Sequence, residues 1–129
     1  MNTLLHSLEL APLWGLVSIR DMGTDDYPQS ADGDYECLAG RGQIYVSTRT
    51  DSEGDVRVRV YLGKADPAVM RVIHEGVMEF KSGIISITAP AMEDEETVIL
   101  PAAGVWQVGV AVSGGGSPDS VDVYLSSVS

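Results

Sequence analysis

Large apolar residues alternate with small or polar residues through much of the chain, which is the period-two pattern of β-strands. The pattern is clearest in residues 105–113, where the even positions are large: Trp106, Val108, Val110 and Val112. It is equally regular in residues 55–62, where the apolar face carries Val56, Val58, Val60 and Leu62. The opposite face of that second segment carries Arg57, Arg59 and Tyr61. Both segments are therefore predicted to be strands with one buried face.

Turn-forming residues separate the alternating segments at short intervals. We expect about eight strands, at residues 13–20, 43–50, 55–62, 69–80, 84–88, 97–100, 105–113 and 120–128. Residues 1–10 fit either a short amphipathic helix or a strand that ends before Pro12. Gly76 is expected to mark a bulge or bend, and residues 81–83 a short hairpin turn.

The chain is predicted to fold as one all-β domain over residues 1–129. It contains no internal repeat and no segment with the apolar period of a long helix. Strands joined by short turns favour an antiparallel β-sandwich, with a jelly-roll-like arrangement, and a small closed barrel is the alternative. A chain of this length buries roughly two thirds of its unfolded surface, so it needs no disulfide or metal to fold.

Charge and cysteine content narrow the classes of function. Nineteen acidic against eight basic side chains give a net charge of −11, which excludes a surface for nucleic acid because phosphates would be repelled. The single cysteine, Cys37, cannot form an intrachain disulfide and favours a reducing compartment. The N-terminal residues do not resemble a signal peptide, and no apolar run is long enough to span a membrane. We therefore expect a cytoplasmic protein without a membrane partner.

No set of residues in the sequence has the pattern of a catalytic or metal site. Cys37 has acidic neighbours, which raise a thiol pKa and reduce its reactivity. His6 and His74 are the only imidazoles, so a zinc site would need both together with carboxylates. A Gly-x-Ser-x-Gly motif is absent. We expect a non-enzyme without catalytic residues, metal or cofactor; a small barrel enzyme or small-molecule binder is the least favoured alternative.

Two acidic segments are the candidate contact surfaces. The first lies in residues 21–42, the longest stretch without periodicity, and the second is the run at residues 93–96, expected to be solvated. The candidate partner-binding residues are the carboxylates of these segments: Asp25, Asp26, Asp32, Asp34, Glu93, Asp94, Glu95 and Glu96. They fit a basic protein partner, although acidity that serves only solubility is the simpler interpretation.

Two further interpretations concern charged residues near these segments. The aspartates of the first segment (Asp25, Asp26, Asp32 and Asp34) could supply oxygen ligands to calcium, although the EF-hand pattern is incomplete. A calcium-dependent ligand-binding module is therefore the alternative function. Arg57 and Arg59 are expected to pair with acidic residues on neighbouring strands rather than to form an anion site.

Several short segments share a pattern with a known family: residues 43–47 and 77–80, the step from Gly83 to Ile84, and the closing strand at residues 122–125. The Leu100-Pro101 step is followed by Gly104 and the aromatic Trp106. Together these segments resemble the competence protein J family of small bacterial inhibitors of the DNA-entry nuclease, whose Leu-Pro-x-Gly-x-Tyr motif has one residue fewer and Tyr in place of Trp. The resemblance covers about two thirds of the chain, and its motifs are structural, so no functional residue is transferred. It implies a β-sandwich that binds a protein, such as a nuclease or toxin, as an inhibitor or immunity-like partner.

Overall fold

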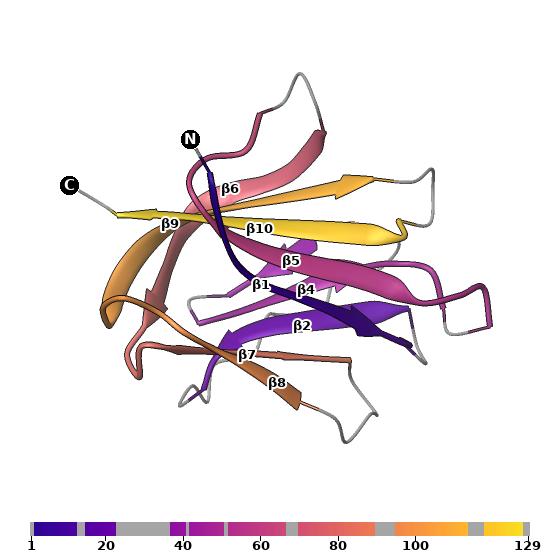
Figure 1. The fold of residues 1–129 in the computed structure, drawn as a ribbon, viewed down its shortest axis with the longest axis horizontal. Helices are drawn as coiled ribbons and strands as arrows, with labels where there is room; N and C mark the ends of the chain where they lie inside the picture. The colour runs from indigo at the N-terminus through magenta and orange to yellow at the C-terminus, as the bar shows by residue number, and fades with distance from the viewer. Residues whose placement is uncertain are drawn as a thin grey trace.

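The computed structural model describes residues 2–12, 15–22, 37–40, 42–50, 52–66, 70–89, 95–113 and 118–127. These residues form ten strands in two five-stranded sheets that pack face to face (Figure 1). The part of the chain that the structure describes contains no helix, and therefore no helix that is long and apolar enough to cross a membrane. The two separate sheets confirm the predicted sandwich and exclude the closed barrel.

Each sheet combines strands that are distant in the chain. Sheet A holds, in spatial order, β1 (Thr3–Leu10), β5 (Val56–Leu62), β10 (Ser120–Ser127), β9 (Gly104–Ser113) and β6 (Arg71–Phe80). Sheet B holds β3 (Cys37–Ala39), β4 (Gln43–Ser47), β2 (Leu16–Asp21), β7 (Ile84–Thr88) and β8 (Glu95–Ile99). Neighbouring strands pair antiparallel, except that β10 runs parallel to β5. The predicted antiparallel β-sandwich is thus confirmed, and it includes one parallel pair.

The core lies between the inner faces of the two sheets. The even positions of β5 and β9 that alternate in the sequence are all directed inward, and most are completely buried: Val56, Val58, Val60, Val108 and Val110. Sheet B contributes Val17, Ile19, Ile44, Val46, Ile85 and Ile87. The burial of these β-branched side chains is the main source of stability, at about 2 kcal/mol for each side chain.

Of the two alternatives for residues 1–10, the strand is confirmed, because residues 3–10 form β1 and pair with β5 along their length. Two other local predictions need correction. The bulge in β6 lies between Val72 and His74 and not at Gly76. Residues 81–83 do form a turn, but β6 and β7 belong to different sheets, so the turn joins the two layers and is not a hairpin.

Asp21 stabilises this turn between the layers. Its carboxylate is almost completely buried and accepts hydrogen bonds from the backbone N–H groups of Lys81, at 3.2 Å, and Ser82, at 3.1 Å. The Ser82 hydroxyl also donates to Asp21. Gly83 completes the turn at φ +72°, a conformation that favours glycine. The end of β2 is thus connected to the point where the chain passes from sheet A to sheet B.

The connection from β5 to β6 joins two strands that β10 and β9 separate, and its described residues 63–66 lie by the outer face of sheet A, where Ala65 approaches Gly109. We call its residues 63–66 the strap. Gly63 donates a backbone hydrogen bond of 2.8 Å to Leu125, and the Asn2 side chain bonds both the N–H and the C=O of Lys64, at 3.0 and 3.2 Å. Tyr124 is buried beside the strap and Asp122 is buried beside Arg59, although both are directed away from the core.

Candidate functional site

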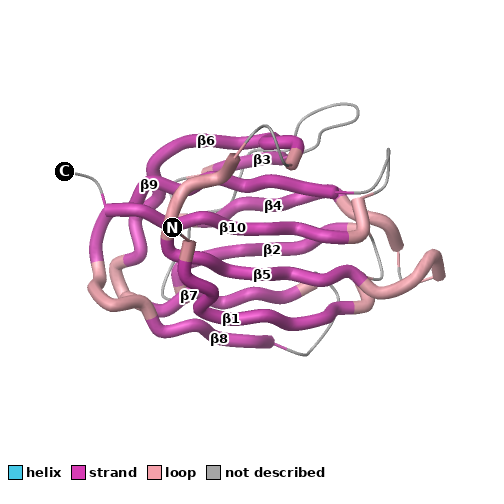
Figure 2. Tube along the Cα trace, turned by 45° about the horizontal axis from the view of Figure 1, so that its top comes forward, coloured by secondary structure: helices cyan, strands magenta, loops and turns pink. Residues whose placement is uncertain are grey.

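Strands β1 and β8 are edge strands of opposite sheets, and they lie side by side where the sandwich is open (Figure 2). A cavity of about 410 Å³ lies at this opening. Four carboxylates line it: Glu9, Asp55, Glu95 and Glu96. Its other lining residues are Leu10, Ala11 and Ala89. We call this opening the acidic mouth.

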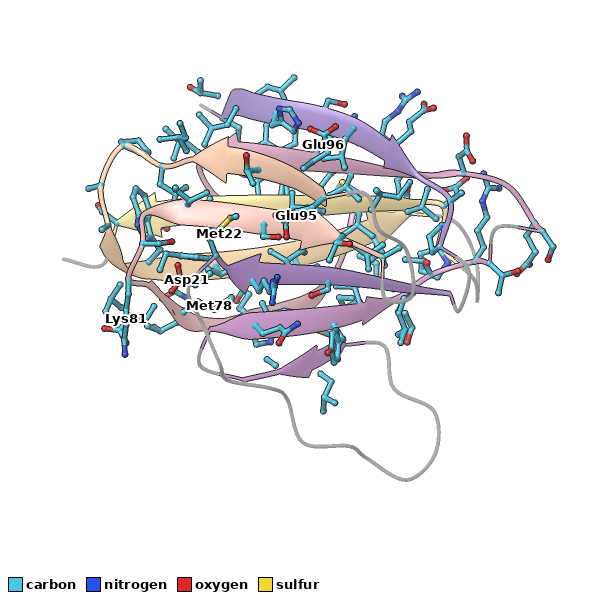
Figure 3. The ribbon with its side chains drawn as sticks, turned by 90° about the horizontal axis from the view of Figure 1, so that it is seen from below. Asp21, Met22, Met78, Lys81, Glu95 and Glu96 are labelled. Atoms are coloured by element: carbon cyan, nitrogen blue, oxygen red, sulfur yellow. The ribbon has the colours of Figure 1, made fainter. Side chains whose placement is uncertain are left out.

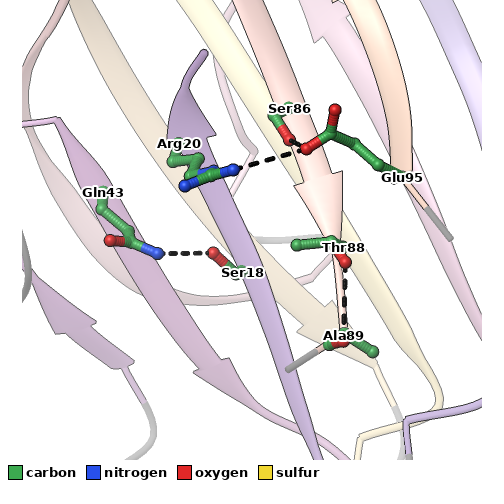
Figure 4. Close-up of polar contacts among 7 residues, drawn as sticks. All are labelled: Ser18, Arg20, Gln43, Ser86, Thr88, Ala89 and Glu95. Atoms are coloured by element: carbon green, nitrogen blue, oxygen red, sulfur yellow. Dashed lines mark hydrogen bonds and ion pairs between the residues drawn. The ribbon is translucent and has the colours of Figure 1, made fainter. Parts of the chain in front are cut away.

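Glu95 and Glu96 begin β8, so their side chains are directed to opposite sides of the strand (Figure 3). Glu95 lies over the outer face of sheet B, where it accepts a hydrogen bond of 2.6 Å from the Ser86 hydroxyl (Figure 4). Arg20 approaches the same carboxylate at 3.4 Å. These contacts with β7 and β2 fix the orientation of Glu95 at the rim of the mouth.

Glu96 is directed to the other side, towards sheet A. The Nε2 atom of His6 on β1 lies 3.3 Å from Glu96 Oε2, in the geometry of an ion pair rather than of a hydrogen bond. This contact links the two edge strands when the imidazole is protonated. Half of the Glu96 side chain remains exposed, so its carboxylate is available to a partner.

The remaining carboxylates come from sheet A and the turn before β5. Glu9 pairs with Arg57 on the neighbouring strand at 3.1 Å, and both side chains are more than half exposed. Asp55 and Glu96 have no arginine or lysine within ion-pair distance among the described residues. The acidic mouth therefore has an excess of negative charge that is only partly neutralised by arginine.

Six of the eight predicted partner-binding residues lie outside the described residues: Asp25, Asp26, Asp32, Asp34, Glu93 and Asp94. Glu95 and Glu96 are described, and they are exposed residues at the start of strand β8. Sequence reasoning did not include Glu9 and Asp55 in the site. The pairing of β1 with β5 brings these two residues together in sheet A, and the packing of the two sheets places them at the same cavity as the start of β8.

The described residues contain no group of three or more histidine, cysteine or acidic side chains that could hold a metal ion. His6 and His74 lie on β1 and β6, the two opposite edges of sheet A, so they cannot share a zinc ion. His74 is half-buried, and burial lowers its pKa against the opposing effect of Glu75. Cys37 is the first residue of β3 and packs half-buried against the core.

The outer face of sheet A carries a second polar cluster. Arg59 donates two hydrogen bonds to Asp122, from Nε at 2.8 Å and from an Nη atom at 2.9 Å, and this interaction raises the Arg59 pKa. The Tyr124 hydroxyl lies 3.4 Å from the same carboxylate, and burial raises the pKa of Tyr124. Tyr124 also stacks on Tyr61, with 5.1 Å between the ring centroids. The predicted pairing of Arg57 and Arg59 with acids on neighbouring strands is confirmed.

Comparison with known proteins identifies the fold. No family model matches the sequence, and no curated protein matches it significantly. One similar solved structure is ComJ from Bacillus subtilis, an inhibitor of the DNA-degrading activity of NucA, with a TM-score of 0.72, 14% identity and 99% coverage of both chains. Another is the protein described as crocagin biosynthetic gene J, with a TM-score of 0.66, 11% identity, and 100% of this chain and 99% of that chain covered. The protein therefore has a ComJ-like fold over its whole length.

Proposed function

We propose that this protein is a non-catalytic inhibitor that binds a nuclease or a similar toxic enzyme. The observation that supports this proposal is the similarity of the complete two-sheet fold to ComJ, which inhibits a nuclease. The absence of a metal-ligand cluster from the described residues is compatible with a binding role.

The acidic mouth is the surface that we assign to the partner. An enzyme that binds DNA presents positive charge around its cleft. This protein has a net charge of −11, so it attracts such a cleft electrostatically. Glu96 and Asp55 supply carboxylates without an arginine or lysine partner among the described residues, whereas Glu95 and Glu9 are oriented by arginines. The partner would thus meet two oriented and two available carboxylates at one opening.

The experiment combines the purified protein with a NucA-like nuclease from the same genome. We expect inhibition of DNA degradation, and an association rate that decreases as salt is added because exposed charges are screened. No inhibition at protein concentrations far above that of the nuclease would overturn the proposed function.

A double variant tests the assignment of the acidic mouth. The substitutions Asp55→Asn and Glu96→Gln retain side-chain shape and remove two charges, so the association rate at low salt should decrease several-fold with little change in dissociation. Glu79→Gln is the matched control, because Glu79 is a partly exposed acid on β6 at the opposite edge of sheet A. If the double variant and the control associate equally fast, the partner uses another surface.

A further inference from the structure

Gly109 lies within β9, yet neither its backbone conformation nor its packing requires glycine. Its φ is not positive, and a Cβ atom at this position would come no closer than 3.9 Å to any neighbour, an ordinary van der Waals contact. Glycine inside a strand weakens the strand and often marks a place where a ligand or another segment of backbone approaches closely. Here the strap approaches, since Ala65 Cβ and Tyr124 Cβ would both lie 3.9 Å from that Cβ atom, and Gly109 also lines a cavity beside the strap.

This cavity has a volume of about 420 Å³ and lies on the outer face of sheet A. It is within the size range of small-molecule sites. Its lining comes from the strap and from strands β6, β9 and β10: Gly63, Lys64, Ala65, Glu75, Gln107, Val108, Gly109, Tyr124, Ser126 and Ser127. It lies on a different face from the acidic mouth, so it does not depend on the proposed inhibitor function.

Two walls of the cavity are held in place before any ligand binds. Asn2 holds the backbone of Lys64 through two hydrogen bonds. Tyr124 is fixed by its stacking on Tyr61 and by contacts of its hydroxyl with Asp122 and with the Met70 sulfur, the latter at 3.8 Å. A preorganised site binds more tightly because little conformational entropy is lost on binding.

The charges of the lining suggest the class of ligand. Lys64 supplies one cation and Glu75 one anion, and neither forms an ion pair within the described part of the chain. Gln107, Ser126 and Ser127 add neutral groups that can donate or accept hydrogen bonds. We propose that the cavity binds a small zwitterion, a free amino acid or short peptide, with its ammonium group at Glu75 and its carboxylate at Lys64.

The first test is a thermal-shift screen of the full chain against the twenty free amino acids and triglycine at millimolar concentration. A ligand that binds only the folded state raises Tm by mass action, so at least one of these probes should do so. Calorimetry on that probe should show binding that disappears when its amine is acetylated or its carboxylate amidated. If none of the probes raises Tm or releases heat, the proposal is overturned.

Variants then place the binding in this cavity. Gly109→Val places two methyl groups beyond a Cβ that already contacts Ala65 and Tyr124 at 3.9 Å, so it should abolish binding and lower the Tm without ligand, whereas Gly109→Ala fits and should leave that Tm unchanged. Glu75→Gln should weaken binding at least tenfold. Glu79 lies four residues further along β6 on the same face, so Glu79→Gln should not change the binding. If Gly109→Val does not fold, Gly109→Ala replaces it. Unchanged binding in both the Gly109 and Glu75 variants would overturn the assignment.

Discussion

Removing Arg59 is expected to destabilise the protein more than removing Asp122, because the two partners of this ion pair are unequally buried. The Asp122 side chain is 2% exposed and that of Arg59 is 32% exposed. In Arg59→Met the carboxylate stays buried, and the Tyr124 hydroxyl, at 3.4 Å, is its one remaining polar neighbour among the described residues. Removal of one partner from a buried ion pair costs about 3–5 kcal/mol of the free energy of unfolding. Because Arg59 is partly exposed, we expect a loss of about 3 kcal/mol.

Asp122→Ala leaves the guanidinium of Arg59 instead, and that group already reaches water. Its loss of two charge-assisted hydrogen bonds should cost about 1–2 kcal/mol. The free energies of unfolding of the two variants should therefore differ by about 1–2 kcal/mol. In a domain of this size, each kcal/mol corresponds to roughly 4 °C in Tm.

Urea denaturation followed by circular dichroism measures both free energies of unfolding, and the m-value should remain constant. The double variant Arg59→Met/Asp122→Ala should be more stable than Arg59→Met alone, because no buried charge is left unpaired. Arg57→Met is the control, since its pair with Glu9 is exposed on both sides and should contribute less than about 1 kcal/mol. A loss in Asp122→Ala equal to or larger than that in Arg59→Met would refute the reasoning.

Three further predictions concern the turn between the layers, the half-buried histidine and the core. Asp21→Ala leaves the N–H groups of Lys81 and Ser82 without their acceptor, and urea denaturation should show a loss of about 2 kcal/mol. Burial lowers the folded-state pKa of His74, so the fold is stabilised above pH 6.5, where the imidazole is neutral, and loses this stability as pH falls. The Tm of His74→Gln should therefore decrease less between about pH 7 and pH 5 than the Tm of the unsubstituted protein. Phe80→Ala removes a completely buried ring, and its calorimetric Tm should fall by an amount equivalent to about 3–5 kcal/mol.

Alternation of side chains predicted the strands well but not their partners. The pattern at residues 55–62 and 105–113 follows from the pleat of a single strand, so it is local information. The neighbour of a strand depends on the whole chain, which is why the parallel pairing of β5 with β10 was not expected. For the same reason, residues 81–83 were recognised as a turn but not as a passage between sheets.

The burial of polar residues on outer faces was also beyond sequence reasoning. Asp122 and Tyr124 alternate with apolar neighbours, so the pattern correctly directs them away from the core. They are nevertheless buried, because Asp122 packs against Arg59, and Tyr124 packs against Tyr61 and Met70. In the acidic mouth, Glu95 and Glu96 were predicted as contact residues, whereas Glu9 and Asp55 join them only through the tertiary fold.

The central position of β10 in sheet A has a consequence for how the chain folds during synthesis. β10 follows every other strand in the sequence, yet it lies between β5 and β9 and separates them. A nascent chain that ends before residue 120 therefore exposes the edges of β5 and β9 that β10 covers in the native fold. It also lacks Val121 and Val123, which are completely buried in that fold. Such intermediates aggregate readily, and pairing over long sequence separations is slow. Ribosome-bound chains should accordingly remain protease-sensitive when β10 is inside the exit tunnel, and become resistant when an added C-terminal linker fills the tunnel and places β10 outside it.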